Sequence, residues 1–273
     1  MLHDYNNLFL YQKHSKMRIF NVPVFYTPYL ITPSPLRKKR KSGFLTPSIN
    51  LSFFDTKISQ STSFPYYFNI SEDKELTFSP TINYGGGVDS SQRFNFNYNQ
   101  ILSGGRLSSN LTIDSTFENQ NSDKWLKDAS FINNYNQNIN ENYKFNIESA
   151  LQTSKNYIQK TNPNDTLSYS SSLSSSIKLS GYNLNIIDDK LEVNLKAYQS
   201  NQNNENNKTI PTVLPHITYY SGLRTYKNNN YINNFEFYNI FRETSTDIHS
   251  KSQRKLSTKF TIEKEKIIYG SKI

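Results

Sequence analysis

Few residues in this chain have the types and the spacing that chemistry would require. The four histidines lie in unrelated sequence contexts, and their spacing matches neither a metal-ligand set nor a catalytic motif. They are His3, His14, His216 and His249. The chain has no cysteine, which excludes a disulfide framework, a Cys-based zinc site and a thiol nucleophile within it. We therefore expect neither a metal site nor a cofactor.

Two pairs of carboxylates and one glycine run remain as candidates for catalysis or phosphate binding. Asp188 and Asp189 fall at an expected turn, and Glu263 and Glu265 are flanked by lysines, so general acid or base work is not expected of either pair. Gly85-Gly86-Gly87 lacks the following helix and the Lys-Ser/Thr of a phosphate-binding loop, and it predicts a hairpin turn. The sequence therefore predicts that the protein is not an enzyme.

The strongest charged motif is a run of five basic residues. It consists of Arg37, Lys38, Lys39, Arg40 and Lys41. One interpretation is a solvated linker without a further role. A nucleic-acid patch would stand beside stacking aromatics in a compact fold, which the rest of the chain does not resemble. A third interpretation is that the run contacts lipid phosphates through charge-assisted hydrogen bonds where a soluble module joins a membrane barrel.

Composition bounds the class of protein. The 273 residues have room for one large β domain or two small ones. An apolar fraction of 35% and a mean hydropathy of −0.72 lean toward disorder. Aromatic residues reach 14% and alternate with polar ones, which instead indicates folded strands. The net charge of +9 favours anionic partners, although codon bias toward Lys and Asn in a low-GC genome explains it equally well.

From about residue 43 onward, apolar and polar residues alternate with a period of two. In residues 93–99 every aromatic residue falls on one face and every amide or cation on the other. The same pattern returns in residues 111–117, 143–148, 169–179, 191–197 and 235–237. Turn signals separate these segments, and tight turns roughly alternate with longer polar connections. Strands of about 10 to 14 residues tilted by about 40° are long enough to cross a bilayer, and the polar face suits a water-filled lumen.

The first 42 residues differ from the rest of the chain. Residues 5–31 contain three short strand-like pieces, and Pro23 and Pro28 confine this part to strand edges or turns. Residues 32–41 read as a linker, so we place a boundary between two modules there. No run of about 18 apolar residues predicts a membrane-spanning helix. The N-terminus lacks the features of a secretory signal, so either the protein is cytosolic or Met1 is not the biological start.

One stretch near the N-terminus resembles a known family. Its pieces are Val22-Pro23-Val24-Phe25-Tyr26-Thr27-Pro28-Tyr29, then Arg40-Lys41-Ser42-Gly43-Phe44-Leu45-Thr46-Pro47, then Pro65-Tyr66-Tyr67-Phe68-Asn69-Ile70 and Leu76-Thr77-Phe78-Ser79-Pro80. In this order and at this spacing they closely resemble the junction segment of the LptD family of LPS-assembly proteins, also called Imp or OstA. Beyond residue 84 the likeness is only one of type, with alternating strands and variable loops.

The resemblance implies an all-β protein, in which part of a large antiparallel transmembrane β-barrel follows the last strands of a periplasmic β-jellyroll. Residues 1–33 would be the C-terminal jellyroll strands, residues 34–42 a basic linker, and residues 43–273 the N-terminal part of the barrel. The family resemblance implies an outer-membrane translocon that inserts lipopolysaccharide into the outer leaflet. The implied partners are lipopolysaccharide, an LptE-like plug lipoprotein, an LptA-like periplasmic bridge and the outer membrane, with no nucleic acid.

The resemblance also assigns a role to two prolines. Pro47 and Pro65 fall in the expected first two barrel strands, where each would remove a ladder hydrogen bond and weaken the seam through which lipid leaves. The alternative is that proline is simply tolerated at strand ends. The missing signal peptide, the missing jellyroll strands and the absent terminal aromatic residue lead us to expect a fragment that cannot close into a barrel by itself.

Two other functional classes remain open at this point. A soluble or secreted β-rich carbohydrate-binding or adhesin module would also contain alternating strands, and a general porin would have the same lipid-facing and lumen-facing pattern. A soluble sandwich would normally carry more Leu, Ile and Val in its strands and would need a second layer to cover each apolar face. Periodicity therefore favours the transmembrane barrel.

Overall fold

The computed structural model describes most of the chain and divides it into two compact units. The described residues are 2–6, 8–19, 21–34, 40–54, 57–85, 91–116, 126–162, 165–184, 188–201, 206–227, 229–244, 251–264, 267–268 and 271–272. Unit 1 comprises Met1–Ile101 and Ser109–Ala129, and unit 2 comprises Leu102–Ser108 and Ser130–Ile273. Nearly all of the regular structure is antiparallel β-structure, which confirms the predicted all-β class. Within these ranges, no helix is both long and apolar enough to span a membrane.

The N-terminal part of unit 1 is a three-stranded sheet. Its strands are β1 (Leu2–Asp4), β2 (Phe9–Ile19) and β3 (Val22–Pro33), in the order β1-β2-β3. The prediction of three short pieces was wrong in this region, because β2 and β3 are long strands that pair along almost their whole length. Pro23 and Pro28 both lie in β3 at the edge of the sheet. An edge strand tolerates prolines because a ladder bond is not needed on its outer side.

The rest of unit 1 is a run of antiparallel strands. They are β4 (Gly43–Phe44), β5 (Ser48–Phe54), β6 (Lys57–Ser63), β7 (Tyr66–Ser71), β8 (Lys74–Gly85), β9 (Ser91–Leu102) and β10 (Gly105–Thr116), the last of which has residues in both units. β5 pairs with β6, β4 with β7, and both β6 and β7 pair with β8, which in turn pairs with β9. Two short strand pairs therefore share one long neighbour.

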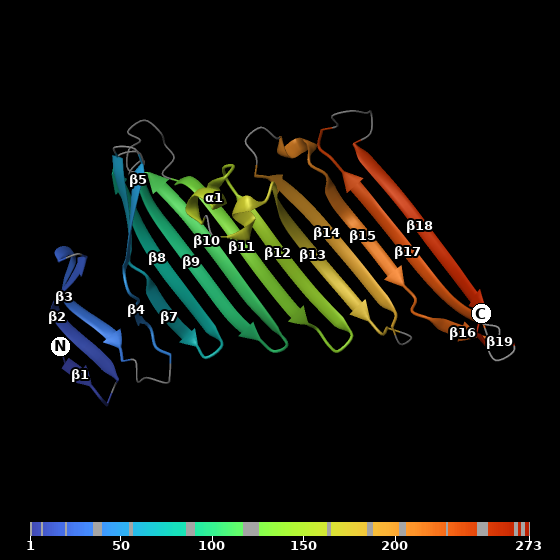
Figure 1. The fold of residues 1–273 in the computed structure, drawn as a ribbon, viewed down its shortest axis with the longest axis horizontal. Helices are drawn as coiled ribbons and strands as arrows, with labels where there is room; N and C mark the ends of the chain where they lie inside the picture. Colours follow the sequence, from blue (N-terminus) through green and yellow to red (C-terminus); the bar gives the residue numbers. More distant parts are fainter. Residues whose placement is uncertain are drawn as a thin grey trace. The chain divides into compact units, whose positions relative to one another are not determined.

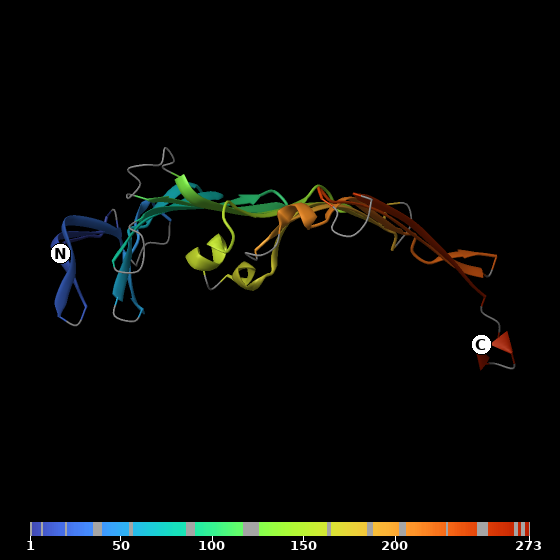
Figure 2. The ribbon, with the colours of Figure 1, turned by 90° about the horizontal axis from the view of Figure 1, so that it is seen from above.

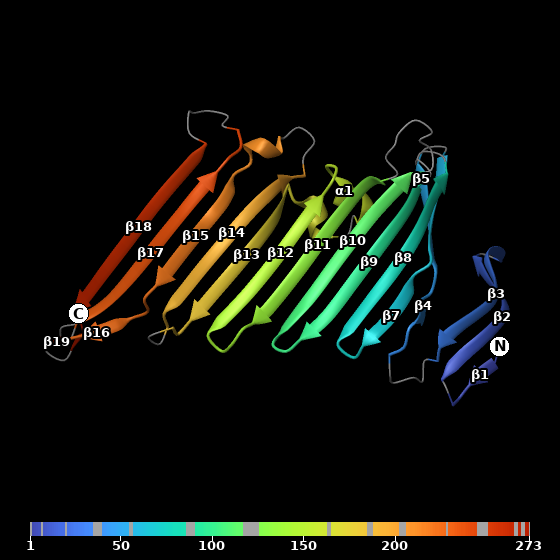
Figure 3. The same cartoon turned by 180° about the vertical axis from the view of Figure 1, so that it is seen from behind.

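Unit 2 continues the antiparallel pattern. They are β11 (Leu126–Asn138), β12 (Tyr143–Gln152), β13 (Ser172–Tyr182), β14 (Lys190–Ser200), β15 (Thr212–Tyr220), β16 (Arg224–Tyr226), β17 (Asn229–Phe241) and β18 (Ser252–Lys264), with the small pair β19 (Ile267–Ile268) and β20 (Ser271–Lys272). The strands lie in the order β11-β12-β13-β14-β15-β17-β18, and β16 also pairs with β17. Figures 1 and 3 show these strands running side by side with a common tilt.

The strand register separates apolar and polar side chains onto opposite faces. Phe78 of β8 lies opposite Phe96 of β9, and their rings stack with centroids 4.8 Å apart. The other face carries linked polar groups, because the Arg93 guanidinium donates to both Asp114 carboxylate oxygens at 2.8 and 3.0 Å. Asn95 lies next to this pair on the same polar face and donates to polar side chains of β10 at 2.8 and 3.0 Å. The alternation seen in the sequence is therefore an alternation of faces.

Connections of two lengths lie at opposite ends of the strands in unit 2. The shorter ones span residues 139–142, 183–189 and 221–228, and the longer ones span residues 153–171, 201–211 and 242–251. Because successive strands are antiparallel, this alternation places all longer connections at one end (Figure 1). In unit 1 the turn between β7 and β8 is shorter still, spanning only residues 72–73, and the Ser71 hydroxyl donates to the Asp73 carboxylate there. That hydrogen bond lowers the pKa of the Asp73 carboxyl below its ordinary value.

The longest of these connections contains structure that the alternation did not predict. α1 (Tyr157–Thr161) and a 3₁₀-helix η1 (Thr166–Tyr169) lie between β12 and β13, on one side of these strands (Figure 2). A second 3₁₀-helix, η2 (Asn207–Thr209), precedes β15. The predicted strand over residues 169–179 was wrong at its start, because Asp165 caps η1 by accepting a hydrogen bond from the Leu167 amide. Asp is a preferred helix cap, and capping draws this end of the segment out of the sheet.

A small apolar cluster holds this connection in place. Ala150, Ile158 and Leu173 are 0–4% exposed and pack together, with Ile132 and Leu167 against them. The amide side chains of Gln152 and Asn201 are also buried and bond to each other at 2.9 Å. This cluster is the main buried apolar core of the described residues. A small core is expected because most strands have no second layer packed on either face.

The described strands do not close into a barrel. In unit 1, β5 pairs only with β6, and in unit 2, β18 pairs only with β17, within the part of the chain that the structure describes. Each therefore keeps one edge with unpaired backbone groups. This agrees with the expectation that this segment cannot close by itself.

We predict that Gly105 is required for close packing of the β9–β10 turn against β11. A Cβ at this position would overlap the Asn136 carbonyl oxygen and the Gln137 side chain. The same turn is held to β11 by a hydrogen bond of 2.8 Å from the Asn138 amide to the Gly104 oxygen. Gly105→Ala should destabilise the folded protein by about 1–3 kcal/mol, the usual cost of overpacking. Thermal unfolding of the complete protein in detergent measures this, with Arg106→Ala as an exposed control in the same turn. Equal stability of Gly105→Ala and the control would contradict the prediction.

Candidate functional site

β4 and β5 together form one interrupted strand, and β6 and β7 form its interrupted partner. We call them the first strand pair, and both are interrupted at the same level. Phe44 lies opposite Tyr66 on one side of the interruption, and Ser48 lies opposite Ser63 on the other. Between these pairs, residues 45–47 face residues 64 and 65. One strand thus carries an extra residue, which bends a ladder and disrupts its pairing locally.

Pro47 and Pro65 lie in this interruption, immediately before β5 and β7 respectively. The Leu45 amide donates to the Pro65 oxygen at 2.9 Å, and the Phe64 amide donates to the Pro80 oxygen at 3.0 Å. Proline has no amide hydrogen, so neither position can donate a ladder bond, although its carbonyl oxygen can accept one. The sequence prediction placed both prolines within strands, whereas they lie between strand segments. Their predicted role as a gate stays a prediction.

An apolar pocket of about 540 Å³ lies beside the interruption, between β3 and the first residues of β4 and β7. Its walls are Phe9, Thr27, Tyr29, Leu30, Ile31, Ser42, Gly43, Phe44, Leu45, Pro47, Phe64 and Tyr66. Several of these apolar side chains remain accessible, with Phe44 51% and Leu45 45% exposed. A concave apolar site with few polar groups is suited to an apolar ligand. We call this cavity the junction pocket.

A row of aromatic side chains leads from the junction pocket along the apolar face. Phe44, Tyr66, Phe78 and Phe96 lie opposite one another on successive strands β4, β7, β8 and β9. The rings of Phe44 and Tyr66 meet edge to face, with centroids 4.9 Å apart. Aromatic pairs of this geometry add about 0.5–1.5 kcal/mol beyond the area that they bury. We call this set the aromatic row.

Two residues of the predicted phosphate-contacting run lie in the described part of the chain, just before the pocket wall. Arg40 forms an ion pair of 2.7 Å with Glu75, which also accepts a hydrogen bond of 2.9 Å from the Tyr67 hydroxyl. The Lys41 ammonium lies 4.0 Å from the centroid of the Phe9 ring. Arg37, Lys38 and Lys39 lie outside the described residues, and the phosphate-contact role of the whole run stays a prediction.

The segment from Arg40 to Ser42 connects the N-terminal sheet to the following strands. Asn69 of β7 donates to the Arg40 oxygen at 3.3 Å and to the Ser42 hydroxyl oxygen at 2.9 Å. On the opposite side, Lys41 contacts Phe9 of β2. This clamp of Arg40, Lys41 and Ser42 holds the two walls of the junction pocket in position.

The other residues considered for chemistry do not come together. His3 bonds to the Ser34 hydroxyl at 2.8 Å, His14 to the Tyr26 hydroxyl at 2.6 Å, and His216 to Glu236 at 3.0 Å, each in a different place. His249, Glu265, Gly86 and Gly87 lie outside the described residues. Asp188 and Asp189 lie in the β13–β14 turn, as predicted, where the buried Asp189 accepts a hydrogen bond from the Leu184 amide.

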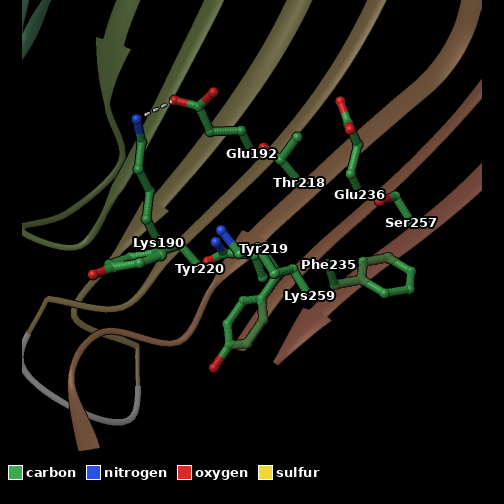
Figure 4. A pocket seen from close by; sticks show the side chains of 10 residues that line it. Lys190, Glu192, Thr218, Tyr219, Tyr220, Phe235, Glu236, Ser257 and Lys259 are labelled. Atoms are coloured by element: carbon green, nitrogen blue, oxygen red, sulfur yellow. Dashed lines mark ion pairs between the residues drawn. The ribbon is translucent and has the colours of Figure 1, made fainter. Parts of the chain in front are cut away.

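A second concavity, of about 400 Å³, lies on the polar face of unit 2. The side chains around it come from β14, β15, β17 and β18 (Figure 4). They are Lys190, Glu192, Thr218, Tyr219, Tyr220, Asn234, Phe235, Glu236, Ser257 and Lys259. We call it the polar groove. It contrasts with the junction pocket because charged and hydroxyl groups predominate in its walls.

Sequence reasoning identified the residues around the junction pocket but not the pocket, the aromatic row or the polar groove. Each of these depends on which residues of different strands lie opposite one another. A period-two pattern assigns a face to each residue but leaves the register between strands open. The polar groove had a partial signal, because Glu192 falls on the polar face of the predicted strand over residues 191–197.

Comparison with known proteins finds a similarity over part of the chain. No family model matches the chain. The chain is 34% identical to the LPS-assembly protein LptD of Hahella chejuensis over 154 residues, which are 55% of this chain and 18% of that protein. Over about half of its length, this chain is similar to LptD. It is also 30% identical to LptD of Shewanella frigidimarina over 149 residues, again 55% of this chain and 18% of that protein. LptD of Shewanella sp. (strain MR-4) is 37% identical over 91 residues, which are 33% of this chain and 11% of that protein.

The chain matches less than a fifth of the length of these LptD proteins. The suspected likeness to an LptD fragment is confirmed. What the complete relatives transport or assemble with is considered below as a proposal for this chain.

We predict that the Arg40–Glu75 ion pair positions the N-terminal sheet against β7 and β8. The Arg40 side chain is 64% exposed, so the pair should stabilise the clamp by no more than about 1 kcal/mol. Arg40→Glu should nevertheless broaden the distance distribution between spin labels at Lys13 and Glu72, because it removes one side of the clamp. The double variant Arg40→Glu/Glu75→Arg should restore the narrow distribution. Failure of the reversed pair to restore it would show that the ion pair has no positioning role.

Proposed function

We propose that this chain forms the first part of the wall of an outer-membrane β-barrel that takes part in lipopolysaccharide assembly, together with the end of the sheet that delivers the lipid. The observation that carries the proposal is the junction pocket, which lies beside an interrupted strand pair and at the start of the aromatic row. The likeness to LptD supplies the lipid class. By this proposal the chain works in the outer membrane and makes or breaks no covalent bond.

The apolar walls of the junction pocket support a path for acyl chains. Ile31 of β3 and Leu45 after β4 both line it, so apolar side chains continue from the N-terminal sheet to the next strands. Burial of apolar surface yields about 25 cal/mol per Å², so an acyl chain leaving the N-terminal sheet gains by staying in contact with these walls. The aromatic row then meets the bilayer as an interfacial girdle would.

The interruption at Pro47 and Pro65 supports a lateral opening at the first strand pair. A seam with fewer ladder bonds needs less free energy to open, because each typical bond contributes about 0.5–1.5 kcal/mol net. In the proposed mechanism lipid A leaves the junction pocket through this seam, while the sugars stay on the polar face. Arg37, Lys38, Lys39, Arg40 and Lys41 would contact lipid phosphates as they pass.

The same proposal assigns the partners. The polar face, with its linked amides and ion pairs, would line the lumen and receive an LptE-like plug lipoprotein, and an LptA-like bridge would deliver lipopolysaccharide to the N-terminal sheet. A soluble β module is disfavoured by the exposed apolar side chains of β18, where Leu256 is 66%, Phe260 59% and Ile262 63% exposed. Soluble proteins rarely leave such rows uncovered.

Replacement of both Pro47 and Pro65 by Ala should strengthen the seam in the complete protein. Each substitution supplies an amide donor, so opening should become rarer and lipopolysaccharide export slower by several-fold. Pro80→Ala is the matched control, since Pro80 lies at the same level in β8 but outside the first strand pair. Pulse-chase measurement of lipopolysaccharide arrival at the cell surface tests this. Unchanged export in the double variant would overturn the gate.

A photocrosslinking amino acid at Tyr29 should capture lipopolysaccharide in cells. Tyr29 lines the junction pocket, whereas Tyr26 of the same strand does not. The two are almost equally exposed, at 50% and 51%, so Tyr26 is a control for simple accessibility. Crosslinking at Tyr29 at least fivefold above Tyr26 is expected, and equal yields at both positions would contradict a lipid path through the pocket.

A further inference from the structure

The polar groove of unit 2 arranges its charges in two rows across the strands. Lys190, Tyr220, Asn234 and Lys259 lie opposite one another on β14, β15, β17 and β18 and form the first row. Glu192 and Glu236 belong to the second row, two residues further along their strands. Figure 4 shows the carboxylates of Glu192 and Glu236 directed to the same side of the sheet. The groove is therefore cationic along one edge and rich in hydrogen-bond acceptors along the other.

The first row has a lysine at each end. Three strand spacings of about 4.8 Å separate the backbones of Lys190 and Lys259, or about 14 Å in total. Lys190 contacts Glu192 at 2.7 Å, whereas Lys259 forms no ion pair with any residue that the structure describes. Long flexible lysine side chains can converge on one anionic group between them, and an ammonium binds phosphate as a compact point charge.

The second row offers acceptors whose positions are already fixed. Glu192 is held between Lys190 and Lys178, at 2.7 and 3.1 Å. Glu236 is held by His216 at 3.0 Å. Carboxylates with satisfied partners still have lone pairs for additional donors, since each ionised carboxylate has about four acceptor positions. The donors that match such a row are the hydroxyl groups of a sugar.

Tyr220 lies between the two lysines and is 39% exposed. A tyrosine ring provides a rigid, amphipathic surface at small entropic cost. A sugar ring can lie against this surface while its hydroxyl groups bond to Asn234 and to the second row. A nucleic acid is a poor match, because the two lysines and two glutamates of the groove sum to zero charge, whereas such partners need a basic patch.

We propose that the polar groove binds a short saccharide that carries a phosphate group, with the phosphate between Lys190 and Lys259 and a sugar ring on Tyr220. The inference rests on the proposed function in taking this face as the wall of the lumen. It adds a defined binding site to that wall, where the proposed transport alone requires only a polar surface.

The test uses the complete protein in detergent micelles and pentamannose 6-phosphate as the probe. Neutral pentamannose and inorganic phosphate are the comparison ligands, so that the sugar and the phosphate are tested separately. Binding is measured by isothermal titration for the natural protein, for Lys190→Gln/Lys259→Gln and for Tyr220→Ala. The matched control is Lys196→Gln/Lys255→Gln, which removes two lysines from the same strands and the same face outside the groove.

We expect the phosphorylated sugar to bind at least tenfold more tightly than either comparison ligand. Lys190→Gln/Lys259→Gln and Tyr220→Ala should each weaken it at least tenfold, and the control should remain within twofold of the natural protein. Absence of binding, equal loss in the control, or equal affinity for inorganic phosphate would overturn the proposal. Heat-modified gel mobility of each variant verifies that it is folded. Because crosslinking at Tyr29 tests lipid transport separately, loss of either result leaves the other interpretable.

Discussion

Antiparallel backbone pairing is the constraint on which the other features of this chain depend. Each strand satisfies its amides and carbonyls only through its neighbours, and pairing then fixes which side chains share a face. Phe78 lies beside Phe96 because of the ladder between β8 and β9, and Arg93 reaches Asp114 because both fall on the opposite face. Among the residues that the structure describes, there is little buried apolar core outside the cluster around Ile158. Its order comes mainly from ladders and from polar links across one face.

Register shifts occur in several strand pairs, and the first strand pair is interrupted in both of its strands. A slip of one residue would move every side chain of a strand to the wrong face, yet between Phe44 and Ser48 the two strands carry unequal numbers of residues. Pairing resumes on both sides, so the irregularity is confined to the positions around Pro47 and Pro65. A local break of this kind disrupts pairing at one level without disturbing the faces elsewhere. The junction pocket lies beside this break.

The sequence predicted faces well and register poorly, for a physical reason. The alternation in residues 93–99 identified both faces of β9, because side-chain direction follows from the period of a strand alone. The aromatic row could not be predicted, since nothing in the spacing of Phe44, Tyr66 and Phe78 specifies that they lie opposite one another. Local capping was not predicted either. Asp165 is the N-cap of a 3₁₀-helix that ends at Tyr169, where alternation alone indicated the start of a strand. The contact of Arg40 with Glu75 joins residues 35 positions apart, and a run of like charges gives no information about its counter-ions.

The two concavities separate two kinds of chemistry. The junction pocket in unit 1 has aliphatic and aromatic walls, and the polar groove in unit 2 has ammonium, carboxylate, hydroxyl and amide groups. Transfer of a charged or hydroxyl-rich group into the apolar pocket would cost several kcal/mol unless its hydrogen bonds were replaced, and an acyl chain gains nothing from the polar groove. An amphipathic molecule in contact with such strands is therefore held in one orientation by the faces themselves. Under the proposed function, the alternation of the sequence would sort the two ends of the cargo, and the interrupted ladder would set where the apolar end leaves.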